Sequence, residues 1–287
     1  MRSLASLSLL FNALVWGVSW WPLRYLQSHG LHPVWATMLF FSLGVLLLGG
    51  WRPAVLPALF RQPALMGLAL VSGFTNATFN WGVSTGDVVR VVLLFYLMPL
   101  WAALLARWLL HEPITRVAVL RMGLALSGAI LVLKPEGQGW PHFAGLPDLL
   151  GLVGGMGFAL TNVLLRRQAH LPSAERAFAM FFGCTALPGL LGGFLYWQGV
   201  VPAWPALEGA WVIPVVALGG LFFMANLALQ YGASHLPVQV TSVLMLTEVL
   251  FASASSVWAG DAQLTPTVVA GAVLILSATL LAARDDA

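Results

Sequence analysis

The chain has 287 residues, of which 60% are apolar and only 8% are charged. A soluble domain needs more polar residues to cover its surface, so these proportions exclude ordinary soluble enzymes and disordered regulators. The single cysteine, Cys184, excludes a scaffold of intrachain disulfides.

The apolar residues fall into long stretches separated by charges, prolines and glycine clusters. A helix needs about 20 mainly apolar residues to cross a hydrocarbon core of about 30 Å. The stretches predict ten membrane helices, at residues 4–27, 33–50, 64–85, 88–110, 116–133, 146–166, 174–197, 210–233, 237–259 and 265–283. The first stretch continues too far for a signal peptide. The longest connections, 51–63 and 134–145, are too short for a soluble domain.

The basic residues predict how the chain lies in the membrane. With a cytoplasmic N-terminus, ten of the thirteen fall on the inner side: Arg2, Arg52, Arg61, Arg107, Arg116, Arg121, Arg166, Arg167, Arg176 and Arg284. Arg24, Arg90 and Lys134 fall outside. Because cytoplasmic loops are enriched in Lys and Arg, we expect a multi-pass membrane protein with both termini in the cytoplasm. The net charge of +3 is then a consequence of topology, and no basic cluster points to nucleic acid.

An internal repeat appears when the sequence is aligned with itself at an offset of 150 residues. Residues 81–131 match residues 231–281 at thirteen of 51 positions, and the same offset pairs Asn12 with Asn162 and Asn76 with Asn226. Residues 1–140 and 141–287 are therefore predicted to be two five-helix repeats. Since five is odd, the second repeat enters the membrane from the opposite side. Inverted repeats of this kind are common in secondary transporters, whose substrate site lies near the midplane between the halves.

Polar side chains inside the predicted helices form aligned faces. Asn76, Phe79 and Asn80 share one helix face, and Asn226 with Gln230 repeats it in the second half. Such amides either join helices by hydrogen bonds or line a cavity, and together they favour a shared polar cavity. Trp16 and Trp101 lie deeper than the other tryptophans, either as core residues or as a wall for aromatic or cationic substrates. Pro99 is expected to kink the fourth helix.

Glu248 is the acidic residue nearest the middle of a predicted span. A charge there costs about 2.5–3.5 kcal/mol on insertion scales, so the residue is expected to contact a cationic substrate or carry a proton. The alternative is a structural hydrogen bond to a neighbouring helix. The predicted substrate-binding residues are Asn12, Trp16, Asn76, Phe79, Asn80, Tyr96, Trp101, Asn162, Asn226, Gln230, Thr241, Met245 and Glu248.

Motifs for catalysis or for cofactors are not found in the sequence. It contains no HExxH, nucleophile elbow, P-loop or GxGxxG pattern, and the six histidines fall in predicted loops or at helix ends. We therefore expect no cofactor, no metal and no enzymatic activity. A membrane-embedded enzyme or a scaffold is the alternative of another class, but an enzyme would need paired catalytic groups at one depth.

The local sequence resembles the drug/metabolite transporter superfamily. Residues 111–115 (His-Glu-Pro-Ile-Thr), followed by a helix with Gly123, are similar to its Glu-x-x-Thr turn and fifth span. Asp261–Thr265 and the helix with Gly271 repeat this more loosely, and Thr247–Glu248 lies where many members carry Glu-Pro. Within the superfamily the chain resembles the EamA-type amino-acid exporters, among them the bacterial YddG exporters of aromatic and other amino acids.

The resemblance implies a basket-shaped bundle in the bacterial inner membrane, around a central cavity that opens alternately to the two sides. From it and from the residues we expect a transporter that exports amino acids, with proton coupling as a further role for Glu248. An exporter of organic cations is the alternative, because one acid and several aromatic rings suit such substrates equally well. The expected partners are this small molecule and the lipid bilayer.

Overall fold

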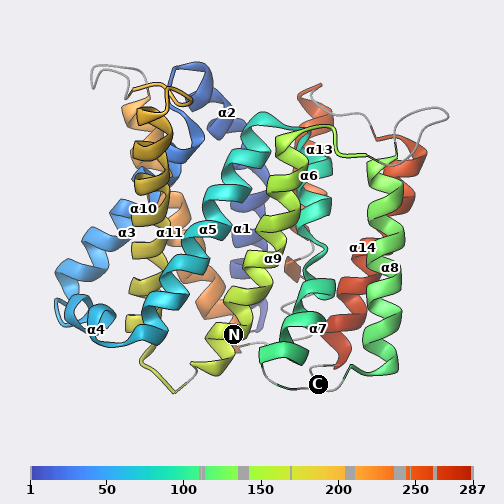
Figure 1. Ribbon diagram of the computed structural model, residues 1–287, viewed down its shortest axis with the longest axis horizontal. Helices are drawn as coiled ribbons and strands as arrows, with labels where there is room; N and C mark the ends of the chain where they lie inside the picture. The colour runs from blue at the N-terminus through green and yellow to red at the C-terminus, as the bar shows by residue number, and fades with distance from the viewer. Residues whose placement is uncertain are drawn as a thin grey trace.

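The computed structural model is a bundle of helices (Figure 1). It describes residues 2–109, 111, 114–134, 142–168, 170–203, 211–235, 244–245, 247–260 and 264–285. Its helices are α1 (Arg2–Val18), α2 (Trp20–Ser28), α3 (Pro33–Trp51), α4 (Val55–Arg61), α5 (Pro63–Thr85), α6 (Val88–Phe95), α7 (Met98–Leu109), α8 (Arg116–Leu133), α9 (Leu146–Arg167), α10 (Ser173–Trp197), α11 (Val212–His235), α13 (Thr247–Trp258) and α14 (Pro266–Asp285).

Each of the ten predicted segments contains a helix in the described part of the chain. Seven helices are long and apolar enough to cross a membrane: Ser3–Ser28, Pro33–Trp51, Val88–Leu109, Arg116–Leu133, Leu146–Leu165, Ser173–Trp197 and Val212–Leu229. α4 and α5 together would form an eighth span, although the two helices are bent by 100° relative to each other at the break between them. The apolar part of α14 is shorter, and α13 begins ten residues later than the predicted segment because residues 236–243 lie outside the description. The multi-pass character is confirmed, and ten crossings stay a prediction.

Three interruptions in the helices follow from prolines. α4 ends before Gln62, which is extended (φ −116°, ψ 102°) because a residue preceding a proline avoids the helical region, and Pro63 then begins α5. The first span is divided at Ser19, three residues before Pro22. The fourth is divided at residues 96–97, just before Pro99, which is the position where the proline predicts a kink. Proline has no N–H to donate to the carbonyl four residues earlier, which is Val18 in the first case and Phe95 in the second.

Helix contacts pair the two halves of the chain. α3 packs antiparallel to α10, since Trp35 near the start of α3 contacts Gly192 and Gly44 farther along contacts Phe181. α8 packs against α14, α1 against α11 and α13, and α9 correspondingly against α5, α6 and α7. A pseudo-twofold relation between repeats 150 residues apart would produce this set of partners. The inverted repeat itself, with divisions at 1–140 and 141–287, remains a prediction.

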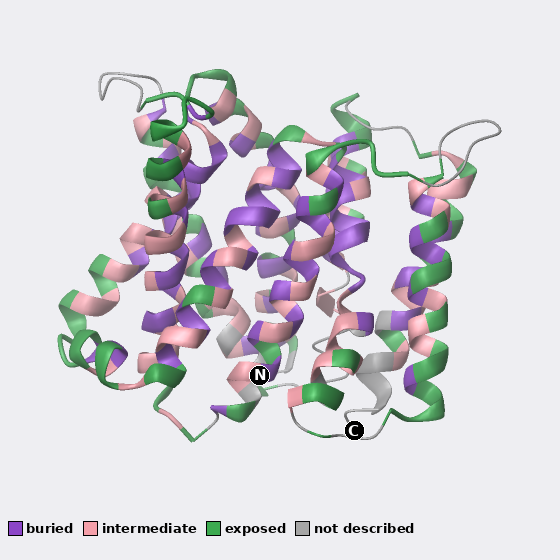
Figure 2. Ribbon diagram, viewed as in Figure 1, coloured by how far each residue is buried: buried purple, intermediate pink, exposed green. Residues whose placement is uncertain are grey.

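The centre of the bundle is its most buried part. α5, α6 and α9 are largely buried, whereas α8 presents exposed apolar residues along one side (Figure 2). Apolar side chains on an outer face are expected where a helix borders lipid. The start of α1 and the end of α14 lie at the same end of the molecule (Figure 1).

Candidate functional site

The interruption between α6 and α7 places Tyr96 opposite α13. Tyr96 is 3% exposed, and its hydroxyl oxygen lies 3.1 Å from Oε2 of Glu248 and 3.2 Å from the carbonyl oxygen of Met245. Glu248 is 8% exposed. In the part of the chain that the structure describes, no basic side chain forms an ion pair with this carboxyl group. Three predicted site residues, Tyr96, Met245 and Glu248, therefore meet at one point.

This meeting point lies near the middle of the membrane-crossing length. Gly17 of α1 packs directly on the backbone of α13: a Cβ at Gly17 would lie 2.8 Å from the carbonyl oxygen of Glu248 and 2.7 Å from Cβ of Phe251. Gly17 is near the centre of the span Ser3–Ser28. α1 and α13 consequently cross at the level of Glu248, which agrees with the mid-span position expected for that acid.

Aromatic rings extend from Tyr96 across the centre of the bundle. Trp16 contacts Phe222 with ring centroids 4.6 Å apart and Phe79 at 6.2 Å. Phe79 contacts Phe95 at 4.7 Å, and Phe95 lies 6.1 Å from the ring of Tyr96. Four helices, α1, α5, α6 and α11, thus contribute to one continuous set of rings beside the Glu248 carboxyl group. We call Trp16, Phe79, Phe95, Tyr96 and Phe222 the aromatic cluster.

The buried amides join helices rather than gathering around Glu248. Nδ2 of Asn12 donates to the Ala225 carbonyl of α11 at 2.8 Å. Nδ2 of Asn80 donates to Oγ1 of Thr37 on α3 at 3.1 Å. The side-chain oxygens of Asn12 and Asn80 are buried and have no hydrogen-bond partner among the described residues. In this conformation both residues hold helices together, and their role in substrate binding stays a prediction.

Two further amides also bond within helices or to neighbouring helices. Nδ2 of Asn76 donates to the Ser72 carbonyl at 3.0 Å and to Sγ of Cys184 on α10 at 3.2 Å. Nδ2 of Asn226 donates within its own helix, to the Phe222 carbonyl at 2.9 Å.

The remaining predicted residues are placed as follows. Asn162 is exposed on α9, seven residues after Gly155 and therefore on the helix face that contacts α6. Trp101 is partly buried on α7, and its Nε1 is buried without a partner among the described residues. Thr241 and the side chain of Gln230 lie outside the described residues.

Sequence reasoning missed three residues of this region. Phe222 lies one helical turn before Asn226, so extending the predicted amide face backwards by four residues would have reached it. Phe95 directly precedes Tyr96. Gly17 gave no local signal, because the need for a small residue there comes from the approach of α13.

Comparisons with known proteins show what parts of this chain are similar to. Residues 3–134 match the EamA-like transporter family. An uncharacterized transporter of Archaeoglobus fulgidus is 28% identical over 239 residues, covering 81% of this chain and 82% of the relative. The uncharacterized transporter YojE of Bacillus subtilis is 27% identical over 199 residues, covering 68% of this chain and 62% of the relative. Both relatives are named as transporters and not as enzymes.

A comparison with solved structures supports the fold. A structure described only as the crystal structure of a protein superimposes with a TM-score of 0.60 over 99% of both chains, at 22% sequence identity. At this identity the likeness shows a shared fold and carries no information about substrate.

Proposed function

We propose, from the membership of residues 3–134 in the EamA-like transporter family, that this chain is a secondary transporter that exports amino acids from the bacterial cytoplasm by alternating access. The observation that carries the proposal is the Glu248 carboxyl group, buried at mid-span beside the aromatic cluster. The resemblance to the YddG exporters of aromatic amino acids is part of this proposal.

The chemistry of Glu248 suits the ammonium group of a substrate. An ionised carboxyl group that is buried without a basic partner is costly, and a substrate cation would offset that cost. The aromatic cluster adds ring faces, which attract cations and pack against aromatic side chains. Tyr96 keeps one carboxyl oxygen oriented while the other can receive the substrate.

The opposite end of an amino acid needs hydrogen-bond donors. Nε1 of Trp101, on the helix that follows Tyr96, has no partner among the described residues and can supply one to a substrate carboxylate. Asn162, exposed on the face of α9 toward α6, can supply another. These two residues are proposed to bind the substrate's carboxylate, and the side chain is proposed to lie against Trp16 and Phe79.

A second candidate is an exporter of organic cations. The absence of a basic partner for Glu248 in the described part of the chain favours it, because an amino acid also brings a negative carboxylate that a basic residue would usually bind. Aromatic rings beside one acid are sufficient for a quaternary ammonium compound.

Transport measurements distinguish the two candidates. Purified protein in proteoliposomes is tested with a panel of labelled amino acids, with and without a pH gradient. Uptake of aromatic or small neutral amino acids supports the proposal, and no transport of any member of the panel rejects it. Competition by quaternary ammonium compounds with none by amino acids favours the second candidate. Dependence of the rate on the pH gradient tests the proton-coupling part of the proposal.

A further inference from the structure

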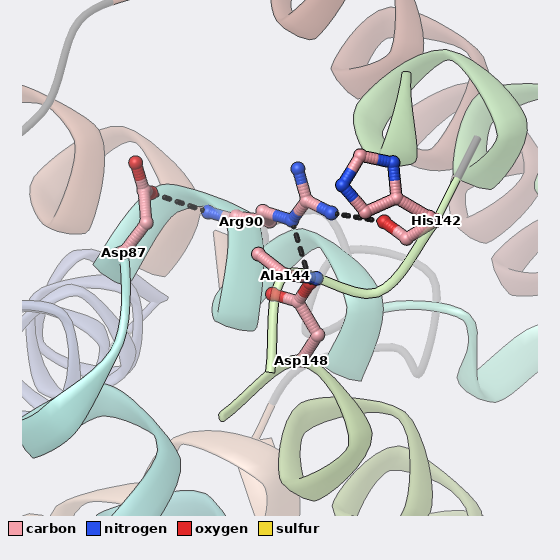
Figure 3. A network of polar contacts seen from close by, with 5 residues as sticks. All are labelled: Asp87, Arg90, His142, Ala144 and Asp148. Carbon is pink, nitrogen blue, oxygen red and sulfur yellow. Dashed lines mark hydrogen bonds and ion pairs between the residues drawn. The ribbon is translucent and has the colours of Figure 1, made fainter. Parts of the chain in front are cut away.

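A network of charges joins the two halves of the chain at one end of the bundle (Figure 3). Nε of Arg90, in the first turn of α6, donates to Oδ2 of Asp148 on α9 at 2.8 Å. Nη2 of Arg90 donates to the His142 carbonyl at 2.7 Å, and the Ala144 N–H donates to the same oxygen of Asp148 at 2.7 Å. The Asp87 side chain caps α6 by accepting from the Arg90 N–H at 2.9 Å, which fixes the turn that carries Arg90.

The two charged side chains are largely removed from solvent. The Asp148 side chain is 4% exposed and that of Arg90 is 18% exposed. Charge-assisted hydrogen bonds in such surroundings are stronger than exposed ion pairs, which contribute little. Separating the two groups loses these hydrogen bonds and leaves a buried charge without its partner, so the network resists a movement of α6 away from α9.

Below the network, α6 and α9 are packed backbone against backbone. A Cβ at Gly151 would lie 2.7 Å from the Val91 carbonyl oxygen, and one at Gly155 would lie 2.3 Å from that of Phe95. This close packing leaves no space for a solute between α6 and α9, from Arg90 to Phe95, the residue before Tyr96. On the side of Arg90, the contact between α6 and α9 therefore closes any route to Tyr96 that would run between these two helices.

Other contacts close the same end of the bundle. Nη2 of Arg24 on α2 donates to the Gly86 carbonyl, which is next to the cap of α6. Nε1 of Trp20 donates to Oγ of Ser255 on α13 at 2.9 Å. The residue that the 150-residue offset pairs with Arg90 is the uncharged Val240, so the repeat does not supply an equivalent arginine for the opposite end.

We propose that Arg90 and Asp148 form a lock that holds the transporter closed on the side of Arg90. The lock must open before the region of Tyr96 and Glu248 can be reached from that side, and it favours the conformation that is closed there. The interruption at residues 96–97 is where α6 would move relative to α7. This inference rests on the proposed alternating-access function, but the first of its two tests does not require a transported substrate.

The test measures how fast a cysteine placed at the contact between α6 and α9 reacts with a thiol reagent. Val91→Cys is introduced together with Cys184→Ala, and the protein in intact cells is treated with a membrane-impermeant thiol reagent from the side of Arg90. The rate of labelling is compared in the parent, in Arg90→Gln and in Asp148→Asn. Either substitution is expected to raise the rate about tenfold, which corresponds to about 1.4 kcal/mol in the opening equilibrium. Arg52→Gln, an exposed basic residue at the other end, is the matched control and should leave the rate unchanged.

The results separate this inference from the proposed function. Both variants must first be shown to insert into the membrane and to be monodisperse in detergent. If they are then labelled no faster than the parent, the proposed lock is wrong, even if transport is confirmed. Raised rates in a protein that moves no tested substrate support the lock and count against the proposed substrates.

A cross-link provides a second measurement that does not depend on the folding of the neutral variants. Arg90→Cys and Asp148→Cys are joined by a bifunctional thiol reagent that contains a reducible disulfide. Transport should be lost on cross-linking and return on reduction. A quantitatively cross-linked protein that transports as fast as its reduced form overturns the inference.

Discussion

The hydroxyl group of Tyr96 has one proton and two acceptors within hydrogen-bond distance, Glu248 and the Met245 carbonyl. If Glu248 is ionised, it accepts the proton of Tyr96. If Glu248 is protonated, it can donate to the Tyr96 oxygen, and the tyrosine proton then turns to Met245. The same three groups thus accommodate both charge states of the acid with small movements. This property would suit a residue that exchanges a proton for a substrate cation.

Glu248→Gln is predicted to reduce transport by about ten- to a hundredfold, since a charge-assisted hydrogen bond of about 1.5–3 kcal/mol is lost. Glutamine has the same shape and can still accept from Tyr96, so folding and membrane insertion should be retained. The measurement is the initial rate of uptake into proteoliposomes, with and without a pH gradient. Glu175→Gln, which removes a half-buried acid near the start of α10, is the control. Unchanged rates in Glu248→Gln under both conditions would assign Glu248 a structural role.

Tyr96→Phe is predicted to have a smaller effect, a decrease of about fivefold, because it loses one hydrogen bond, for which a typical contribution is about 1 kcal/mol. The carboxyl group of Glu248 remains in this variant and only its orientation is relaxed. The same uptake assay measures it. A decrease larger than that of Glu248→Gln would mean that the tyrosine hydroxyl group, and not the acid, is the principal contact.

At the scale of helices, glycine determines how closely α9 can approach its neighbours. Gly155 lies where the backbone of Phe95 passes, and Gly154 and Gly157 lie against Thr78 and Thr75 of α5. Small residues allow membrane helices to pack closely, and here they bring α6 near enough to α9 for the ends of the two helices to be joined. The position of Tyr96 therefore depends on residues that do not contact it.

Gly155→Ala is predicted to destabilise the protein by about 1–3 kcal/mol, because the added Cβ would overlap the Phe95 carbonyl oxygen and force the helices apart. Thermal unfolding in detergent measures this as a lower Tm. Gly123→Ala is the matched control, since nothing lies within 4 Å of a Cβ at Gly123. That variant should gain about 0.5–1 kcal/mol from its lower unfolded-state entropy. An equal Tm for both variants would show that the contact between α6 and α9 is looser than described.

At the scale of the whole molecule, the sequence predicted where the membrane helices lie but not which residues contact one another between helices. Membrane thickness fixes the length of an apolar helix, so nine of the ten predicted segments coincide with helices to within a few residues, and in the segment 237–259 the described helix α13 begins ten residues late. α4 was missed because its prolines suggested a connection. Asn76 and Asn80 share a helix face as predicted, yet they bond to α10 and α3 respectively. The pairing of Tyr96 with Glu248 joins residues 152 positions apart, which no local pattern can indicate.

The orientation of the whole molecule gives the last prediction. α5 and α10 end at one end of the bundle, and α3 and α9 end at the other (Figure 1). The residues at these helix ends, Thr85 and Gln198 on one side and Arg52 and Arg167 on the other, are exposed. Because the inner side attracts basic residues, cysteines at positions 85 and 198 should react with an impermeant reagent in intact cells, whereas those at 52 and 167 should react only after permeabilisation. The buried Cys184 of the parent should remain unlabelled in both conditions. Labelling of positions 52 and 167 in intact cells, without labelling of 85 and 198, would mean that the orientation is the reverse of the predicted one. Labelling of only one position from each pair would mean that the two positions of a pair lie on opposite sides of the membrane, which contradicts the predicted number of crossings between those two positions.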